Sequence, residues 1–193
     1  MMKESLIAFK VSLVTILLTA VLYPLAVTSF STLLFYKQAS GSLIIDEQHK
    51  IIGSELIGQA FENPAYFFSR PSVTVKGYEG LVSGGSNLGP TSHALVNRIQ
   101  EQVEMLKKDN AELIPLDLVT TSGSGLDPHI SPEAAYWQAP RVALYRNVSL
   151  KRIFSIIDEL IEPPHFTFLG EKRVNVLKLN ITLNQFLGSP VIP

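Results

Sequence analysis

The stretch VSLVTILLTAVLYPLAVTSFSTLLFY, residues 11–36, decides the architecture of this 193-residue chain. Its 26 residues carry no charge, and as an α-helix they would extend for about 39 Å, enough to cross a hydrocarbon core of about 30 Å. Pro24 removes one backbone hydrogen bond near the middle and predicts a kink. A cleaved secretory signal would need an apolar stretch of only about 7 to 15 residues. The sequence therefore predicts one uncleaved membrane anchor.

The charges on either side of this stretch set its expected orientation. Lys3, Lys10 and the terminal amine precede it, and Lys37 is the only base close behind it. Because positive charges favour the cytoplasmic side of a membrane helix, we expect residues 1–10 to form a short cytoplasmic tail. Residues 11–36 would then span the cell membrane once, and residues 37–193 would form a domain outside the cytoplasm.

Small or hydroxylated residues recur at intervals of three, four or seven in and just before the apolar stretch. They are Ala8, Ser12, Thr15, Thr19 and Ala26. Residues at these intervals share one face of a helix, and small faces allow membrane helices to pack closely. Ser and Thr are also simply tolerated in membrane helices. Both interpretations stay open, and the five residues are a candidate face for a partner helix in the bilayer.

Residues 37–193 have the size of one domain and a nearly balanced charge. They contain 14 Lys and Arg against 16 Asp and Glu, with no basic run longer than two residues. Nucleic acid is therefore an unsuitable partner. The chain has no cysteine, which excludes disulfides, thiolate nucleophiles and cysteine-ligated zinc or iron–sulfur sites.

Hydrophobic periodicity predicts strands and helices that alternate along this domain. The short apolar runs 43–45 and 51–52 predict a hairpin against the membrane. Residues 90–108 predict an amphipathic helix. Its core-facing residues would be Leu95, Ile99, Val103 and Leu106.

The second half of the domain predicts a strand at 116–121, two helices and a final strand at 173–180 with a β-bulge. Ser131, Pro132 and Glu133 are typical of a helix start, and Pro140 should stop or bend that helix. Residues 150–161 predict another helix, capped by Ser149. This order indicates a mixed α/β (α+β) fold on a single transmembrane helix, and it does not determine the strand order.

Two Gly-rich segments are candidates for binding a nucleotide or a partner loop. One comprises Ser83, Gly84, Gly85, Ser86 and Asn87, and it runs toward the helix at 90–108. The other comprises Ser122, Gly123, Ser124 and Gly125. Backbone amides next to a helix N-terminus can hold an anion, but a tight structural turn has the same composition. The second segment lacks the lysine of a phosphate-binding Walker loop.

Other candidate sites are weaker. The four histidines are dispersed, and no metal site is legible. Asp127 and His129, beside Ser122 and Ser124, supply the residue types of a hydrolase triad without its nucleophile-elbow motif. Asp127 before Pro128 is more typical of a turn former. Arg70 and Arg141 could hold carboxylates of a partner or brace loops inside the domain, and we favour the internal role.

Five segments in a fixed order identify a family. They are GSELIGQ at 53–59, YFFSRPS at 66–72, SGGSNLGP at 83–90, SGSGLDPHISP at 122–132 and GEKRVNVL at 170–177. With its single N-terminal span, nearly the whole chain resembles the C subunits of the bacterial Kdp potassium-transporting ATPase. It departs from them at Val73 and Tyr145, where the family often or usually has alanine.

The resemblance implies a non-catalytic subunit of a high-affinity potassium uptake pump. Its partners would be a channel-like potassium-binding subunit, a P-type ATPase subunit and a very small membrane subunit. The chain has no D-K-T-G phosphorylation sequence, so the chemistry belongs to a partner. The family is described as a catalytic chaperone that raises the ATP affinity of the ATPase subunit, which implies ATP reached through that partner and no tightly bound cofactor.

The expected orientation conflicts with direct ATP binding, because loops outside the cytoplasm cannot touch cytoplasmic ATP. We therefore hypothesise that the span clamps the complex while the domain caps the extracellular mouth of the potassium-binding subunit. A membrane-tethered hydrolase would need Ser122 or Ser124 activated by His129, and it lacks an oxyanion-hole motif. A free-standing adhesion or scaffold module would leave the five segments unexplained.

Overall fold

The structure is a computed structural model that describes residues 2–46, 48–74 and 77–190. The chain divides into two compact units, Met1–Ile51 and Ile52–Pro193. We call them the N-terminal unit and the C-terminal unit and describe each by itself.

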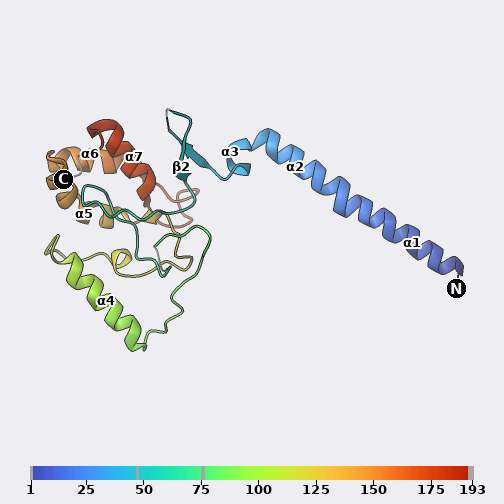
Figure 1. The fold of residues 1–193 in the computed structure, drawn as a ribbon, viewed down its shortest axis with the longest axis horizontal. Coiled ribbons are helices and arrows are strands. Elements are labelled where there is room, and N and C mark those ends of the chain that lie inside the picture. The colour runs from blue at the N-terminus through green and yellow to red at the C-terminus, as the bar shows by residue number, and fades with distance from the viewer. Residues whose placement is uncertain (1, 47, 75–76, 191–193) are drawn as a thin grey trace. The chain divides into compact units, whose positions relative to one another are not determined.

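The N-terminal unit is dominated by one long helix (Figure 1). It consists of α1 (Met2–Ile16), a π-helical turn (Leu17–Leu22) and α2 (Tyr23–Leu34), followed by α3 (Tyr36–Ala39). The helix Met2–Leu34 has a mean hydropathy of 2.2, and none of its most apolar window is buried inside the protein. Among the described residues it is the one helix long and apolar enough to cross a membrane.

Pro24 is accommodated by a wider turn. The Tyr23 N–H donates to the carbonyl of Leu18, five residues back, in the π-helical turn that immediately precedes Pro24. Turns of this kind occur where the hydrogen bonds of an α-helix are locally interrupted. The ribbon in Figure 1 continues from α1 into α2, and the kink expected at Pro24 is not visible in it as a sharp break.

The predicted hairpin is present. Strands β1 (Leu43–Ile45) and β2 (Ile51–Ser54) form a two-stranded sheet. Asp46 closes the turn, because its N–H donates to the Lys50 carbonyl at 2.9 Å and its carboxylate accepts from the N–H groups of Gln48 and Lys50 at 2.9 and 2.8 Å. An Asp that bonds the backbone two and four residues on is a strong turn former.

The C-terminal unit is a mixed α+β fold. Its helices are α4 (His93–Leu106), the 3₁₀ turn η2 (Leu116–Leu118), α5 (Pro132–Arg146), α6 (Leu150–Leu160) and α7 (Val176–Leu187). Its strands are β3 (His129–Ile130), β4 (Ile161–Glu162) and β5 (Arg173–Asn175). They form an antiparallel sheet in the order β3-β5-β4, which pairs His129 with Asn175 and Glu162 with Arg173.

The helix starts predicted at Ser131 and Ser149 are confirmed. The Ser131 hydroxyl accepts from the Ala134 N–H at 3.0 Å, and the Ser149 hydroxyl accepts from the Arg152 N–H at 3.4 Å. Each cap satisfies a backbone donor that the first helical turn leaves free. Pro140 does not stop α5, which continues to Arg146 and is followed by Asn147 in a left-handed conformation. Pro140 is exposed, so water can reach the carbonyl that its ring leaves without a partner.

The amphipathic helix is shorter than predicted, but its face is confirmed. It begins at His93 rather than at residue 90. Leu106 is part of the hydrophobic core, and Ile99 and Val103 pack against that core. Leu95 is half-buried.

The strand predicted at 116–121 is wrong. Leu116–Leu118 form a 3₁₀ turn, and the Thr120 hydroxyl and N–H both donate to the Leu116 carbonyl. Leu116 is 73 % exposed, whereas the successive residues Leu118 and Val119 are both buried. A strand with one buried face would alternate instead.

The long final strand with a bulge is also wrong. β5 ends at Asn175, whose side-chain oxygen accepts from the Lys178 N–H at 3.1 Å and caps α7. Val174 and Val176 are two residues apart, which is the spacing of one face of a strand. The buried residues Val176, Leu179 and Leu183 are three or four residues apart, which is the spacing of one face of a helix. The change of phase in the sequence therefore marks a strand that turns directly into a helix.

The core lies where α5, α6 and α7 meet the sheet, and these helices gather together in Figure 1. Its fully buried residues include Phe67, Val142, Ile153, Ile157, Leu179 and Leu183. Among the described residues, no strand pairs with the segment that contains Phe67. Side chains from α5 and α7 bond its backbone instead: Asn180 bonds both the N–H and the carbonyl of Phe67, and Gln138 does the same for Phe68.

Candidate functional site

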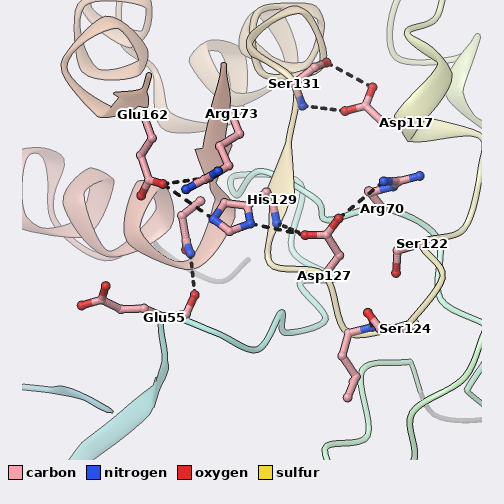
Figure 2. A network of polar contacts seen from close by, with 12 residues as sticks. Glu55, Arg70, Asp117, Ser122, Ser124, Asp127, His129, Ser131, Glu162 and Arg173 are labelled. Atoms are coloured by element: carbon pink, nitrogen blue, oxygen red, sulfur yellow. Dashed lines mark hydrogen bonds and ion pairs between the residues drawn. The ribbon is translucent and has the colours of Figure 1, made fainter. Parts of the chain in front are cut away.

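A cluster of charged side chains gathers beside the three-stranded sheet (Figure 2). We call it the His129 cluster, and its members are Glu55, Arg70, Asp127, His129, Glu162, Arg173 and Lys178. The sheet brings distant residues together, because β5 lies between β3, which carries His129, and β4, which carries Glu162. Lys178 lies in the first turn of α7, directly after β5.

His129 lies between two carboxylates. Its Nδ1 is 3.3 Å from Asp127 Oδ1, and its Nε2 is 3.8 Å from Glu162 Oε2. Asp127 Oδ2 is also 3.4 Å from Arg70 Nη1. On the other side, Glu162 contacts Arg173 Nε at 3.1 Å and Lys178 Nζ at 3.2 Å. Asp127 thus contacts Arg70 and His129, Glu162 contacts His129, Arg173 and Lys178, and Glu55 contacts Lys178 at 2.9 Å.

These contacts hold Asp127 and Glu162 in their charged form. Burial raises the pKa of Asp127, but hydrogen bonds from His129 and the charge of Arg70 outweigh it, and the net pKa lies below the ordinary value. Burial also raises the pKa of Glu162. The hydrogen bonds and charges of Lys178 and Arg173 outweigh burial, so the net pKa of Glu162 lies below its ordinary value. For Lys178, burial lowers the pKa, but Glu55 and Glu162 raise it overall. Asp127, Glu162 and Lys178 are therefore charged at neutral pH.

An open pocket of about 620 Å³ lies next to this cluster. Arg70, Asp127 and His129 form part of its wall, Leu116 and Asp117 another part, and residues 171–173 a third. Arg70 is held in place, since its guanidinium also donates to the Thr120 hydroxyl at 3.3 Å and the Thr121 carbonyl at 3.4 Å. The pocket presents both signs of charge and selects neither anions nor cations.

Arg70 and Arg141 both have the internal role that the sequence favoured. Arg141 is buried, forms an ion pair with Asp109 at 3.0 Å and donates to the Tyr66 carbonyl at 3.0 Å. Burial lowers the pKa of Arg141 to about 10, and Asp109 opposes that shift. Within the described ranges, no group of three or more His, Cys, Asp or Glu residues is placed to hold a metal ion.

The residue types of a hydrolase triad do not assemble into one. The buried Ser122 hydroxyl accepts from the Gly125 N–H at 2.9 Å, and the Ser124 hydroxyl accepts from the Leu126 N–H at 3.1 Å. Both nitrogens of His129 face carboxylates, and Figure 2 shows the two serines apart from its ring. Asp127 accepts from the His129 backbone N–H at 3.0 Å, which confirms its role as a turn former. The geometry lacks a nucleophile next to its base.

The two Gly-rich segments pack against each other. The Gly84 N–H donates to the Ser124 carbonyl at 2.8 Å, and the Ser83 hydroxyl donates to the same carbonyl at 3.1 Å. A Cβ on Gly125 would lie 2.7 Å from the Gly84 oxygen, and one on Gly85 would lie 3.0 Å from the Gly123 oxygen. The glycines thus allow two backbones to approach closely. The sequence predicts each segment by itself and gives no sign of this contact between residues about 40 positions apart.

This contact changes what the loops offer to a ligand. The N–H groups of Gly84 and Gly125 already have partners inside the protein, so they are not available to an anion. Residues 83–87 also stop short of α4, which begins at His93. Ser86 is half-buried, while Asn87 and Gly123 are exposed. Nucleotide or partner binding by these residues stays a prediction.

The candidate partner-helix face lies along the long N-terminal helix. Ala8, Ser12 and Thr15 are in α1, Thr19 is in the π-helical turn, and Ala26 is in α2. The Thr19 hydroxyl donates to the Thr15 carbonyl at 2.8 Å, so its hydrogen bond is satisfied within the helix. The π-helical turn Leu17–Leu22 separates Ala26 from Ala8, Ser12 and Thr15 along the helix. Packing along this face stays a prediction.

Sequence reasoning did not identify Glu55, Glu162, Arg173 and Lys178 as members of a site. Glu55 and Lys178 are 123 residues apart in sequence, and none of the four residues belongs to a recognisable chemical motif. The only local signal was the pair Asp127 and His129, whose spacing already indicated a shared loop. The sheet order that joins them was not predicted.

Comparisons with known proteins identify the family. Residues 5–185 match the family model described as "KdpC: K+-transporting ATPase, c chain". The chain is 48 % identical over 191 residues to the potassium-transporting ATPase KdpC subunit of Myxococcus xanthus, covering 97 % of this chain and 90 % of that protein. It is 51 % identical over 176 residues to that of Methylococcus capsulatus (89 % and 92 %), and 49 % identical over 197 residues to that of Rhodopseudomonas palustris (95 % and 98 %).

These matches confirm the resemblance, and they extend over nearly the whole chain and nearly the whole length of its relatives. The N-terminal apolar helix lies largely within the matched region. The chain therefore belongs to the KdpC family, the membrane-associated subunits of the potassium-transporting ATPase that support potassium transport.

Proposed function

We propose that this chain is a non-catalytic accessory subunit whose C-terminal unit acts through contacts with other proteins and without holding a nucleotide in its Gly-rich loops. The observation that carries the proposal is the pairing of those loops: the Gly84 N–H donates to the Ser124 carbonyl, and the Gly125 N–H donates to the Ser122 hydroxyl. A phosphate-binding loop needs backbone N–H groups that are free and point toward the same anion. Here these N–H groups are already bonded to atoms of the two loops.

The charges around the membrane helix support an extracytoplasmic C-terminal unit. Lys3 and Lys10 lie toward one end of the apolar region, and Lys37 alone follows it. With the N-terminus in the cytoplasm, the C-terminal unit has no access to cytoplasmic ATP. An effect on the ATP affinity of the ATPase subunit, which the family description attributes to a catalytic chaperone, would then have to be transmitted through the other subunits.

The partners in this account are the channel-like potassium-binding subunit, the P-type ATPase subunit and the small membrane subunit. The membrane helix contributes the small-residue face to their assembly, which is consistent with the absence of buried residues in α1 and α2 in the chain alone. The C-terminal unit covers the extracellular mouth of the potassium-binding subunit and stabilises or gates potassium entry. The mutually paired loops and the ion pairs of the His129 cluster suit a structural cap better than a catalytic site.

Hydrogen–deuterium exchange in the assembled, detergent-solubilised ATPase tests the absence of nucleotide contact. Detergent opens both faces of the complex to ATP, so the result does not depend on orientation. We expect millimolar ATP to leave exchange in residues 83–87 and 122–125 unchanged, because the Gly84 and Gly125 amides are already bonded. Peptides of the ATPase subunit, which should become protected, serve as the positive control. ATP-dependent slowing in either loop would contradict the proposal.

A further inference from the structure

The β1–β2 hairpin exposes three aliphatic side chains, Leu43 at 36 %, Ile45 at 55 % and Ile51 at 57 %. Leu43 and Ile45 are two residues apart in β1 and therefore lie on the same face of the strand, while the residue between them is half-buried. Asp46 and Lys50 face each other across the turn, because the Asp46 N–H donates to the Lys50 carbonyl. The next residues along the two strands, Ile45 and Ile51, then lie opposite each other and share a face. We call Leu43, Ile45 and Ile51 the hairpin face.

The hairpin begins beside the end of the uncharged run 11–36. Lys37 and Leu43 are six positions apart in sequence, but the Ser42 N–H donates to the Lys37 carbonyl at 2.8 Å. Gly41 and Ser42 both have positive φ, at 84° and 50°, so the short helix α3 ends there in a tight turn. Leu43 is therefore held close to the residue that directly follows the uncharged run.

The residues at this end of the run are typical of a membrane interface. Phe35 is 52 % exposed and Tyr36 70 %, and aromatic residues at the end of a spanning helix gather at the level of the lipid headgroups. A bilayer has a hydrocarbon core of about 30 Å and measures about 40–45 Å with its headgroups, which leaves an interfacial layer of about 5–8 Å on each side. At about 3.3 Å per residue, Ile45 lies at most about 7 Å farther out than Leu43. The hairpin face therefore lies within this layer or at its border, whatever the tilt of the hairpin.

The interface also suits the backbone of the hairpin. A two-stranded sheet leaves N–H and C=O groups unpaired along its outer edges, and hydrocarbon alone cannot satisfy them. At the interface, water and headgroups reach these edges while acyl chains cover an apolar face. Lys50, which precedes Ile51, is exposed, and a lysine side chain is long enough to reach the headgroups. Lipid already surrounds the end of the preceding helix, so the position of the hairpin favours lipid over a protein as the occupant of its face.

We infer that the hairpin face inserts among the lipids of the interface and forms a second membrane contact beside the spanning helix. Burial of aliphatic side chains provides the attraction, so the contact does not need anionic headgroups. It fixes the rotation of the helix about its own axis and so sets the direction in which the chain leaves the bilayer. The inference holds for either orientation of the chain and does not depend on the proposed accessory role.

Photo-crosslinking tests this contact in the complete ATPase, reconstituted into nanodiscs of uncharged phosphatidylcholine. A diazirine amino acid replaces Ile45 or Ile51, and in the matched control it replaces Gln48, which is exposed in the turn of the same hairpin. We expect lipid adducts to be several-fold more abundant at positions 45 and 51 than at position 48. Adducts at 45 and 51 mainly with another subunit or with a second copy of this chain overturn the inference, as do equal lipid yields at all three positions.

Removing the other apolar residues of the face separates insertion from mere nearness to the membrane. With the probe at position 45, Leu43→Ser together with Ile51→Ser should lower the yield of lipid adducts several-fold, whereas Gln48→Ser should leave it unchanged. An unchanged yield in the double variant would show that the aliphatic side chains do not hold the hairpin in lipid, and the inference would fail. Only chain that co-purifies with the assembled ATPase is measured, so misfolded chain does not contribute.

Discussion

Replacing Asn180 by leucine is expected to lower the free energy of unfolding of the C-terminal unit by about 2–6 kcal/mol. Asn180 is 2 % exposed, and its amide donates to the Phe67 carbonyl and accepts from the Phe67 N–H, both at 2.9 Å. It takes the place of a neighbouring strand for this buried segment. Leucine fills a similar volume but leaves two buried backbone groups without partners, each at a cost of about 1–3 kcal/mol.

Urea unfolding of the full chain in detergent measures this loss. Trp137 is the chain's single tryptophan and is 5 % exposed, so its fluorescence reports unfolding of the C-terminal unit. The midpoint should fall by about 1 M urea or more. Gln185→Leu is the matched control, because Gln185 is exposed on the same helix and should change stability by less than about 0.5 kcal/mol. Equal midpoints for the two variants would refute the assigned role of Asn180.

Replacing Gly125 by alanine should separate the two Gly-rich loops and destabilise the C-terminal unit by about 2–5 kcal/mol. Gly125 has φ of +67°, and an added Cβ would lie 2.7 Å from the Gly84 carbonyl oxygen. Part of the cost is the left-handed backbone, and part is the displacement of a backbone atom. The Gly84 oxygen cannot move away freely, because the Gly84 N–H is bonded to Ser124.

Gly123→Ala provides a control within the same loop. Gly123 does not have a left-handed φ, and a Cβ there would meet nothing within 4 Å, so alanine should be neutral or slightly stabilising. The same Trp137 unfolding measurement compares the two variants. In Gly125→Ala alone, the Gly84 amide should also exchange faster with deuterium. If both alanine variants behaved alike, the loops would not be packed as described.

The sequence predicted correctly the features that depend on residues close together in the sequence. The long apolar helix, the hairpin around Asp46 and the starts of α5 and α6 at Ser131 and Ser149 follow from length, turn chemistry and capping. It failed where two local patterns compete. Asn175 ends a strand and caps a helix within one apolar run, and the mixture of periods was interpreted as a bulge.

Most of the site depended on contacts between distant residues. The pair Asp127 and His129 was visible because its members are two residues apart, but Glu162 joins them only through the order of the three strands. Likewise, the glycines at 84 and 125 looked like possible phosphate loops, because sequence alone does not show that one backbone fills the space beside the other. A glycine in the sequence indicates that the backbone there can adopt unusual conformations or approach another backbone closely. Only the packing of the folded chain shows which of these a given glycine does.

The most direct test of the central claim is to find on which side of the membrane the C-terminal unit lies. The chain has no native cysteine, so single cysteines at the exposed positions Ser40 and Gln185 can be labelled in intact cells with a membrane-impermeant maleimide. We predict labelling at both positions, which would place the C-terminal unit outside, away from cytoplasmic ATP. Labelling at neither position before permeabilisation, and at both afterwards, would contradict the account and make direct enhancement of ATP affinity the leading mechanism.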